Sequence, residues 1–368
     1  MRLPDLDAHP HASAVLGSAL GGALSHAYLL QGPAGSGKRA AARAFAAELL
    51  AEGAPEPEGA RARVHSGAHP DLTWVTPSGA HEMRRDDVKH AVVAAAAHTP
   101  FEARRRVFVL ERVDTMNDEA ANTLLKTLEE PPEYVVLLLL TDRPSQVLPT
   151  ISSRCQPVRF DAVPSAVLAE RLEAEGVEPP RALACARLSL GDGDRARLLA
   201  GPAGEALRAS AEKLARASLH GTAAREKPWH ALLAAGGERA AVARAELERA
   251  RDEELEFVPT KERRRRSSDY DERIKRAERR AQTEAIEHAL QLAGLWYRDL
   301  ACVASGAPDL AHNADRGTVL AQDAQGRRPA ALREAVELVD DTRARLALNV
   351  SEELALEALA YRLERALA

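Results

Sequence analysis

A glycine-rich run that ends in lysine is the segment of this sequence best suited to bind phosphate. Gly32, Gly35 and Gly37 precede Lys38 in the pattern GxxxxGK, and Arg39 follows where serine or threonine is expected. Glycines let backbone N–H groups turn toward a phosphate, a helix N-terminus adds positive potential, and lysine supplies a point charge. The run predicts a phosphate-binding loop (P-loop); the alternative is an ordinary glycine-rich turn.

The residue after the lysine weakens the expectation of catalysis. In P-loop enzymes a hydroxyl at this position normally binds Mg²⁺. Arg39 has no hydroxyl, and a guanidinium cannot coordinate a cation. The loop is therefore expected either to bind ATP or ADP weakly, as a degenerate nucleotide site, or only to hold the fold, and no metal site is predicted.

A second set of chemically relevant residues follows the aliphatic run 106–110, which is expected to be a strand beside the P-loop strand. Glu111 could approach a metal ion, but Arg112 stands where a carboxylate would activate water. An arginine cannot act as a base at pH 7, and loss of a general base costs about 10²–10⁴ in rate. Unless Asp114 or another acid substitutes, the chain is expected to turn over little or no ATP.

The elements around these residues alternate between strands and helices over the first 160 residues. Residues 52–70 are rich in Gly, Pro, Glu and Arg and are predicted to form a loop, and Thr115 and Asp118 have the spacing of a capping box. This alternation predicts a parallel sheet with helices on both sides. Strands are expected over residues 26–31, 72–75, 106–110 and 134–140, and helices over residues 38–51, 85–98 and 115–130.

Beyond residue 160 the strand pattern disappears and the chain is predicted to be helical. Residues 261–280 carry ten Lys or Arg and five Asp or Glu, including Arg263 to Arg266. Such a run could contact DNA phosphates or an acidic partner, but a solvated helix or a flexible insertion is the commoner explanation.

Composition excludes several classes of protein. The 368 residues include 50 Lys or Arg and 55 Asp or Glu, so the net charge of −5 argues against a protein that coats nucleic acid through bulk positive charge. Cys155, Cys185 and Cys302 are too far apart for a disulfide framework. No apolar run reaches the ~18–20 residues that span a bilayer, and the N-terminus lacks a signal-peptide pattern. A cytoplasmic protein without membrane contact is expected.

Several motifs together resemble the delta-prime family of bacterial DNA polymerase III clamp-loader subunits, which are AAA+ proteins. The similarity is good over residues 1–160, weaker to about residue 200, and in the C-terminal part rests on residues 296–300 and 349–356. The motifs are residues 26–30, which precede the P-loop, and residues 69–72, 120–132 and 151–155.

The resemblance implies three domains and assigns roles to three further positions. An α/β P-loop AAA+ domain with a parallel sheet is expected over 1–160, a small helical lid over 161–203, and an all-α collar over 204–368 with a charged insertion near 225–282. Arg154 matches the arginine finger that in this family reaches a neighbour's ATP site, where it is worth about 10³–10⁵ in rate; the alternative is a local salt bridge or helix cap. Thr141 matches the polar side chain that contacts the γ-phosphate, and at the sensor-2 position Asp194 replaces the expected arginine.

The function that the resemblance implies is that of a non-hydrolysing or weakly active subunit. It would provide Arg154 in trans and act as a stator in a five-subunit ring with tau/gamma and delta subunits, which loads the sliding clamp on primed DNA. The alternatives are an ATP-hydrolysing tau/gamma-type motor subunit or another P-loop nucleotide-binding enzyme. Related loaders often carry a four-cysteine zinc module, but residues 52–68 contain no cysteine, and His65 and His69 alone cannot form a four-ligand site, so no zinc is expected.

Overall fold

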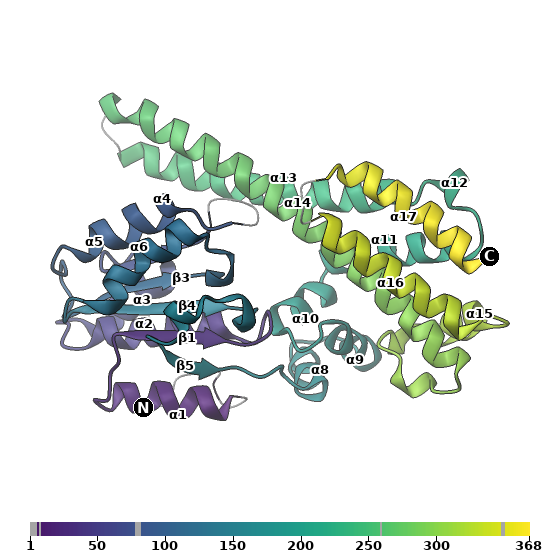
Figure 1. Cartoon of the computed structure of the whole chain (residues 1–368), viewed down its shortest axis with the longest axis horizontal. Coiled ribbons are helices and arrows are strands. Elements are labelled where there is room, and N and C mark those ends of the chain that lie inside the picture. The colour runs from purple at the N-terminus through teal and green to yellow at the C-terminus, as the bar shows by residue number, and fades with distance from the viewer. Residues whose placement is uncertain (1–5, 7–8, 78–81, 258–259, 347–349) are drawn as a thin grey trace. The chain divides into compact units, whose positions relative to one another are not determined.

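The computed structural model describes residues 6, 9–77, 82–257, 260–346 and 350–368. The chain divides into two compact units, shown in Figure 1. The first comprises residues 1–163 with 191–193, and the second comprises 164–190 and 194–368. The separate limits of lid and collar stay a prediction. Among the helices of the described residues, none combines the length and apolar character needed to cross a membrane.

The first unit is built on a parallel sheet of five strands in the order β2-β3-β4-β1-β5. The strands are β1 (Ala27–Gln31), β2 (Leu72–Val75), β3 (Arg106–Leu110), β4 (Val135–Thr141) and β5 (Gln156–Arg159). The helices are α1 (Pro10–Leu20), α2 (Lys38–Ala51), α3 (Pro57–Ser66), α4 (Arg85–Val88), α5 (Ala94–Ala96), α6 (Asp118–Glu129) and α7 (Pro149–Ser152), with a π-helical turn over Lys89–Val93 and 3₁₀ turns over Val113–Thr115 and Pro144–Gln146.

The strand order corrects one prediction from the sequence. The strand that precedes Glu111 was expected beside the P-loop strand, but β4 lies between β1 and β3. All seven residues of β4 are buried, as expected for a central strand of a parallel sheet that is covered on both faces.

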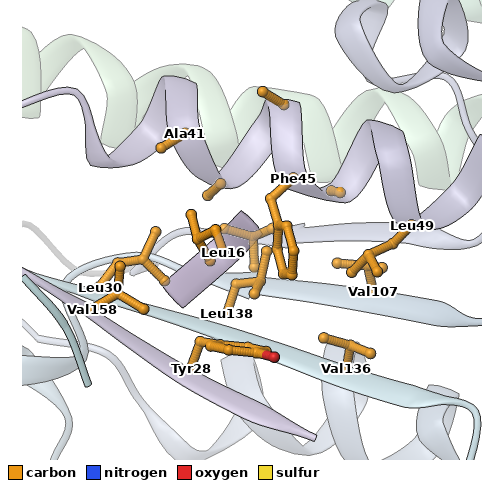
Figure 2. Close-up of a cluster of buried hydrophobic side chains, with 14 of the residues drawn as sticks. Leu16, Tyr28, Leu30, Ala41, Phe45, Leu49, Val107, Val136, Leu138 and Val158 are labelled. Carbon is orange, nitrogen blue, oxygen red and sulfur yellow. The ribbon is translucent and has the colours of Figure 1, made fainter. Parts of the chain in front are cut away.

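Helices cover both faces of this sheet, and the strand residues alternate between two apolar clusters. Tyr28 and Leu138 belong to the cluster under α1, α2 and α3, whereas Leu29 and Leu137 belong to the cluster on the side of α4 to α7. Figure 2 shows the first cluster, in which Phe45 of α2 reaches toward the sheet. The Phe45 ring meets Tyr28 edge-on, with 5.4 Å between ring centroids. The alternation of apolar side chains along each strand therefore accounts for the three-layered unit.

Three local predictions differ from the structure, and two elements were not predicted. Residues 52–70 are not all loop, because α3 forms there and buries Ala60 and Val64. Helix α6 is capped by Asn117, whose side chain accepts a hydrogen bond from the backbone N–H of Ala120, and not by Thr115. The helix expected over 85–98 is divided by the π-helical turn. Strand β5 and helix α1 were not predicted.

The second unit is entirely helical in the residues that the structure describes. Two 3₁₀ turns, Pro308–Leu310 and Ala314–Arg316, connect α14 to α15. The α-helices are α8 (Ser165–Ala174), α9 (Pro179–Leu188), α10 (Gly193–Ala200), α11 (Pro202–Leu219), α12 (Ala223–Glu226), α13 (Trp229–Phe257), α14 (Thr260–Ala304), α15 (Gly317–Ala324), α16 (Pro329–Leu346) and α17 (Glu352–Leu367).

The motif at residues 296–300 stabilises this second unit. Trp296, Tyr297 and Leu300 are buried in the helical core. The fully buried Asp299 carboxylate accepts hydrogen bonds from the backbone N–H groups of His312 (2.9 Å) and Asn313 (2.8 Å). Buried carboxylates require such partners, so this motif fixes the loop after α14 to the helix.

The charged insertion forms an antiparallel pair of long helices, α13 and α14, which lie side by side in Figure 1. Arg244 pairs with Glu278 (3.5 Å) and Arg251 with Asp271 (3.6 Å), so the two arms run in opposite directions. The basic run at the start of α14 follows the acidic end of α13, residues 252–256. Residues 261–280 are therefore helical; of the four consecutive arginines, the side chains of 264–266 lie outside the described residues.

Candidate functional site

The P-loop lies between β1 and α2, at the sheet edge where the parallel strands end. Gly37 has a φ of 86°, a left-handed conformation that favours glycine, and it immediately precedes α2. At Gly32 a Cβ atom would come within 2.1 Å of the Phe160 backbone oxygen, so no side chain fits there. The carboxyl edge of a parallel sheet is where such folds bind their ligands.

Lys38 is buried and bound to the loop itself. Its Nζ donates hydrogen bonds to the backbone oxygens of Gly32 (2.7 Å) and Pro33 (2.5 Å) and pairs with Asp142 at 2.8 Å. Asp142 directly follows β4, so the central strand carries the carboxylate that neutralises this lysine. A phosphate would have to compete with these partners for the ammonium group.

A carboxylate also contacts the loop at Gly35. A Cβ atom there would lie 1.8 Å from Asp192 Oδ1, and the backbone N–H of Gly193 donates to the Gly35 oxygen at 3.2 Å. This acidic contact was not predicted from the sequence. Asp194, at the expected sensor-2 position, and Arg195, one residue later, belong to the second unit.

Arg39, at the position of the missing hydroxyl, forms an ion pair with Glu111. The distance from Arg39 Nε to Glu111 Oε1 is 2.8 Å, and Trp74 Nε1 donates to the same oxygen at 2.6 Å. Glu111 is 12% exposed, whereas Arg39 is 67% exposed. The acid that could have approached a metal ion thus already has a cationic partner.

The residues after Glu111 do not provide a free base. Arg112 has a left-handed backbone, with φ of 52°. Asp114, the candidate substitute acid, accepts a hydrogen bond of 2.8 Å from Thr141 Oγ1. Thr141 is the last residue of β4, and its hydroxyl oxygen also accepts from the backbone N–H of Arg143 at 3.0 Å. The structure therefore places Thr141 at the carboxyl edge of the sheet, where its hydroxyl is held against Asp114.

Arg154 lies at the opposite edge of the sheet. It follows α7 and precedes β5. Its Nη2 pairs with Glu129 at 2.7 Å, and its Nη1 donates to the Thr150 backbone oxygen at 2.9 Å. The side chain is 38% exposed beside a surface hollow that is also lined by Ser25, just before β1. The local salt bridge that was the alternative for this arginine is thus present in the isolated chain.

The motif at residues 69–72 is structural. The Asp71 carboxylate is buried and accepts hydrogen bonds from the backbone N–H groups of Phe101, Glu102 and Ala103, at 2.7, 3.0 and 3.0 Å. Burial lowers the pKa of His69, which lies 3.2 Å from Glu102. Within the part of the chain that the structure describes, no group of three His, Cys, Asp or Glu residues could hold a metal ion, and the absence of zinc stays a prediction.

Comparisons with known proteins agree with this fold and these motifs. Residues 9–164 match the family model described as DNA polymerase III, delta subunit. DNA polymerase III subunit delta' of Pseudomonas aeruginosa is 43% identical over 157 residues, which cover 40% of this chain and 47% of that protein. Residues 9–164 are therefore similar to DNA polymerase III delta and delta' subunits. The chain spans about half the length of the curated relatives it matches.

Further DNA polymerase III subunits are also similar to this chain. The delta' subunit of Bacillus subtilis is 36% identical over 170 residues, 45% of this chain and 51% of that protein. The tau subunit of Bacillus subtilis is 34% identical over 182 residues, 46% of this chain and 31% of that protein. A gamma subunit-related protein from Thermotoga maritima has a TM-score of 0.45 and 17% identity, covering 97% of this chain and 100% of that structure. The AAA+ fold is accordingly assigned from the P-loop, the parallel sheet and the sequence relatives.

Proposed function

We propose that this chain is the non-hydrolysing, or weakly active, delta-prime subunit of a DNA polymerase III clamp loader. In this role it provides Arg154 in trans to the ATP site of a neighbouring subunit. It acts as a stator while the loader places the sliding clamp on primed DNA. Any ATP or ADP at its own P-loop is bound weakly and is not turned over.

The observation that carries the proposal is the position of Arg154 relative to its own P-loop. Arg154 lies where β1 and β5 begin, and the P-loop follows the end of β1. The five residues of β1 span about 16 Å at ~3.3 Å per residue. An arginine at that edge cannot reach a phosphate on its own P-loop, so any nucleotide phosphate that it contacts belongs to another subunit.

The contacts at the P-loop support the absence of hydrolysis. Arg39 and Glu111 neutralise each other, and Arg112 cannot accept a proton from water. Asp114 is hydrogen-bonded to Thr141. The residues needed to hold a metal ion and to activate water are thus replaced or engaged.

The partners of this function are the other clamp-loader subunits. We propose that tau/gamma and delta subunits form a five-subunit ring with this chain, and that the clamp and DNA are contacted through the complex. The second unit would pack in the ring's collar. A cytoplasmic location, without membrane contact, follows from this role in replication.

A motor subunit of the tau/gamma type is the second candidate, because the tau subunit of Bacillus subtilis is similar over the same region. It would require a hydroxyl at the place of Arg39 and an acid at the place of Arg112. A different P-loop enzyme would leave Arg154 without a role. Both alternatives are therefore weaker.

ATP turnover by the purified chain tests the proposal, with Lys38→Ala as the control. We expect no turnover above that of the control. Turnover that Lys38→Ala abolishes would show that the chain is a motor subunit. Mixing with tau/gamma and delta subunits should in addition give a stable complex, which a P-loop enzyme of another class would not form.

A further inference from the structure

The residues at this P-loop do not fit the Mg²⁺ ion that P-loop nucleotide sites ordinarily hold. Mg²⁺ requires near-octahedral oxygen ligands at about 2.0–2.1 Å, and a P-loop site supplies one from the hydroxyl after the lysine. Arg39 stands at this position. The chain thus presents nitrogen donors where the metal ion needs an oxygen acceptor.

The contacts of Arg39 define its electrostatic role. Its guanidinium lies against Glu111, the carboxylate at the end of β3, with 2.8 Å between Nε and Oε1. Trp74 of the neighbouring strand β2 donates to the same oxygen at 2.6 Å, which fixes the carboxylate. Glu111 is largely buried, and such a carboxylate requires a compensating cation.

The charges leave no place for a divalent ion beside this pair. A metal ion bound by Glu111 would displace Arg39 from it, and the displaced guanidinium would remain a like charge nearby. The positive charge that a metal ion would bring is already attached to the chain. Two-thirds of the Arg39 side chain is exposed.

We infer that Arg39 is a built-in cation that replaces the divalent metal at this P-loop. As a consequence, Mg²⁺ does not strengthen the binding of a nucleoside diphosphate to the chain. The inference deepens the proposed absence of hydrolysis but does not depend on Arg154 or on assembly. A failure here would leave the role of Arg154 untouched.

ADP binding to the purified full-length chain, measured by calorimetry with Mg²⁺ or with EDTA, tests the inference. For the wild type we expect dissociation constants within about twofold in the two buffers, or no binding in either, and Arg39→Lys should behave likewise. Arg39→Ser supplies a hydroxyl and frees Glu111, so Mg²⁺ should tighten ADP binding at least about tenfold, or about 1.4 kcal/mol. Arg39→Ala is the matched control, because it removes the same cation and frees Glu111 but adds no hydroxyl.

Two results would overturn the inference. One is a wild-type chain that binds ADP at least about tenfold more tightly with Mg²⁺ than with EDTA. The other is an Arg39→Ser chain, folded by circular dichroism, in which Mg²⁺ tightens ADP binding no more than it does in the wild type. Binding of Mn²⁺ followed by electron paramagnetic resonance gives an independent readout, with uptake expected only in Arg39→Ser with ADP.

Discussion

Replacing Arg154 with alanine should separate folding from function. The ion pair with Glu129 joins side chains that are 38% and 50% exposed, and exposed pairs of this kind contribute about 0.2–1 kcal/mol. The free energy of unfolding should therefore fall by less than about 1 kcal/mol, a shift in Tm of at most about 4 °C. At the neighbour's ATP site, loss of an arginine finger costs about 10³–10⁵ in rate, or about 4–7 kcal/mol of barrier.

The assay is ATP hydrolysis and clamp loading by the complex assembled from this chain, its partner subunits, the clamp and primed DNA. Because Arg154 would serve one ATP site of the ring, the amplitude of the burst of ATP hydrolysis should fall by the contribution of that one site. Glu129→Ala is the matched control, since it breaks the same ion pair but keeps the guanidinium. Arg85→Ala, at an exposed position in the same unit, controls for loss of surface charge.

Unchanged burst amplitude and clamp loading in an assembled Arg154→Ala complex would refute the finger role. Equal losses in Arg154→Ala and Glu129→Ala would show instead that the local ion pair matters. Either result would favour the alternative role of Arg154, a local salt bridge.

Three further perturbations address the P-loop, the core and the helical unit. Lys38→Ala should change the rate of clamp loading by the assembled complex less than about twofold, as a substitution without functional effect does. A large loss of that rate with intact assembly would mean that nucleotide at this loop matters. Phe45→Ala should lower the free energy of unfolding by about 3–5 kcal/mol in urea titrations, because the side chain is fully buried; a cost below about 1 kcal/mol would contradict the packing. Burial and three nearby arginines lower the pKa of His288 to about 3. The unfolded chain therefore binds a proton more tightly than the folded chain, and the free energy of unfolding should fall as the pH drops from about 6.5 toward 3, by up to about 1.4 kcal/mol per pH unit. His288→Gln should remove that part of the pH dependence.

The sequence predicted the central strands because their aliphatic runs are buried on both faces. All residues of β3 and β4 are buried, and such runs have no other common explanation in an α/β pattern. Strand β5 was missed because only Val158 of its four residues is buried, so it lacks the apolar run of the inner strands. Helix α3 was missed because it buries only Ala60 and Val64 in a segment otherwise rich in turn-forming and charged residues.

The chemical types at the site were also predictable, but their pairings were not. The absence of a hydroxyl at position 39 and of an acid at position 112 is visible in the sequence. That Arg39 meets Glu111, or that Asp142 meets Lys38, depends on the order of the strands. Hydrophobic periodicity reports whether a strand is buried and not which strand lies beside it, and for this reason β3 was wrongly expected beside β1.

The helical pair of α13 and α14 makes the length of this chain adjustable. The C-terminal part of α13 and the N-terminal part of α14 contact each other. The C-terminal part of α14 instead carries the buried core residues Ile286, Leu290 and Trp296. Removal of equal whole heptads from both arms preserves the face that each helix presents to the other. Helical turns can thus be removed from or added to this pair without repacking the core, which makes the segment suitable for engineered changes of length.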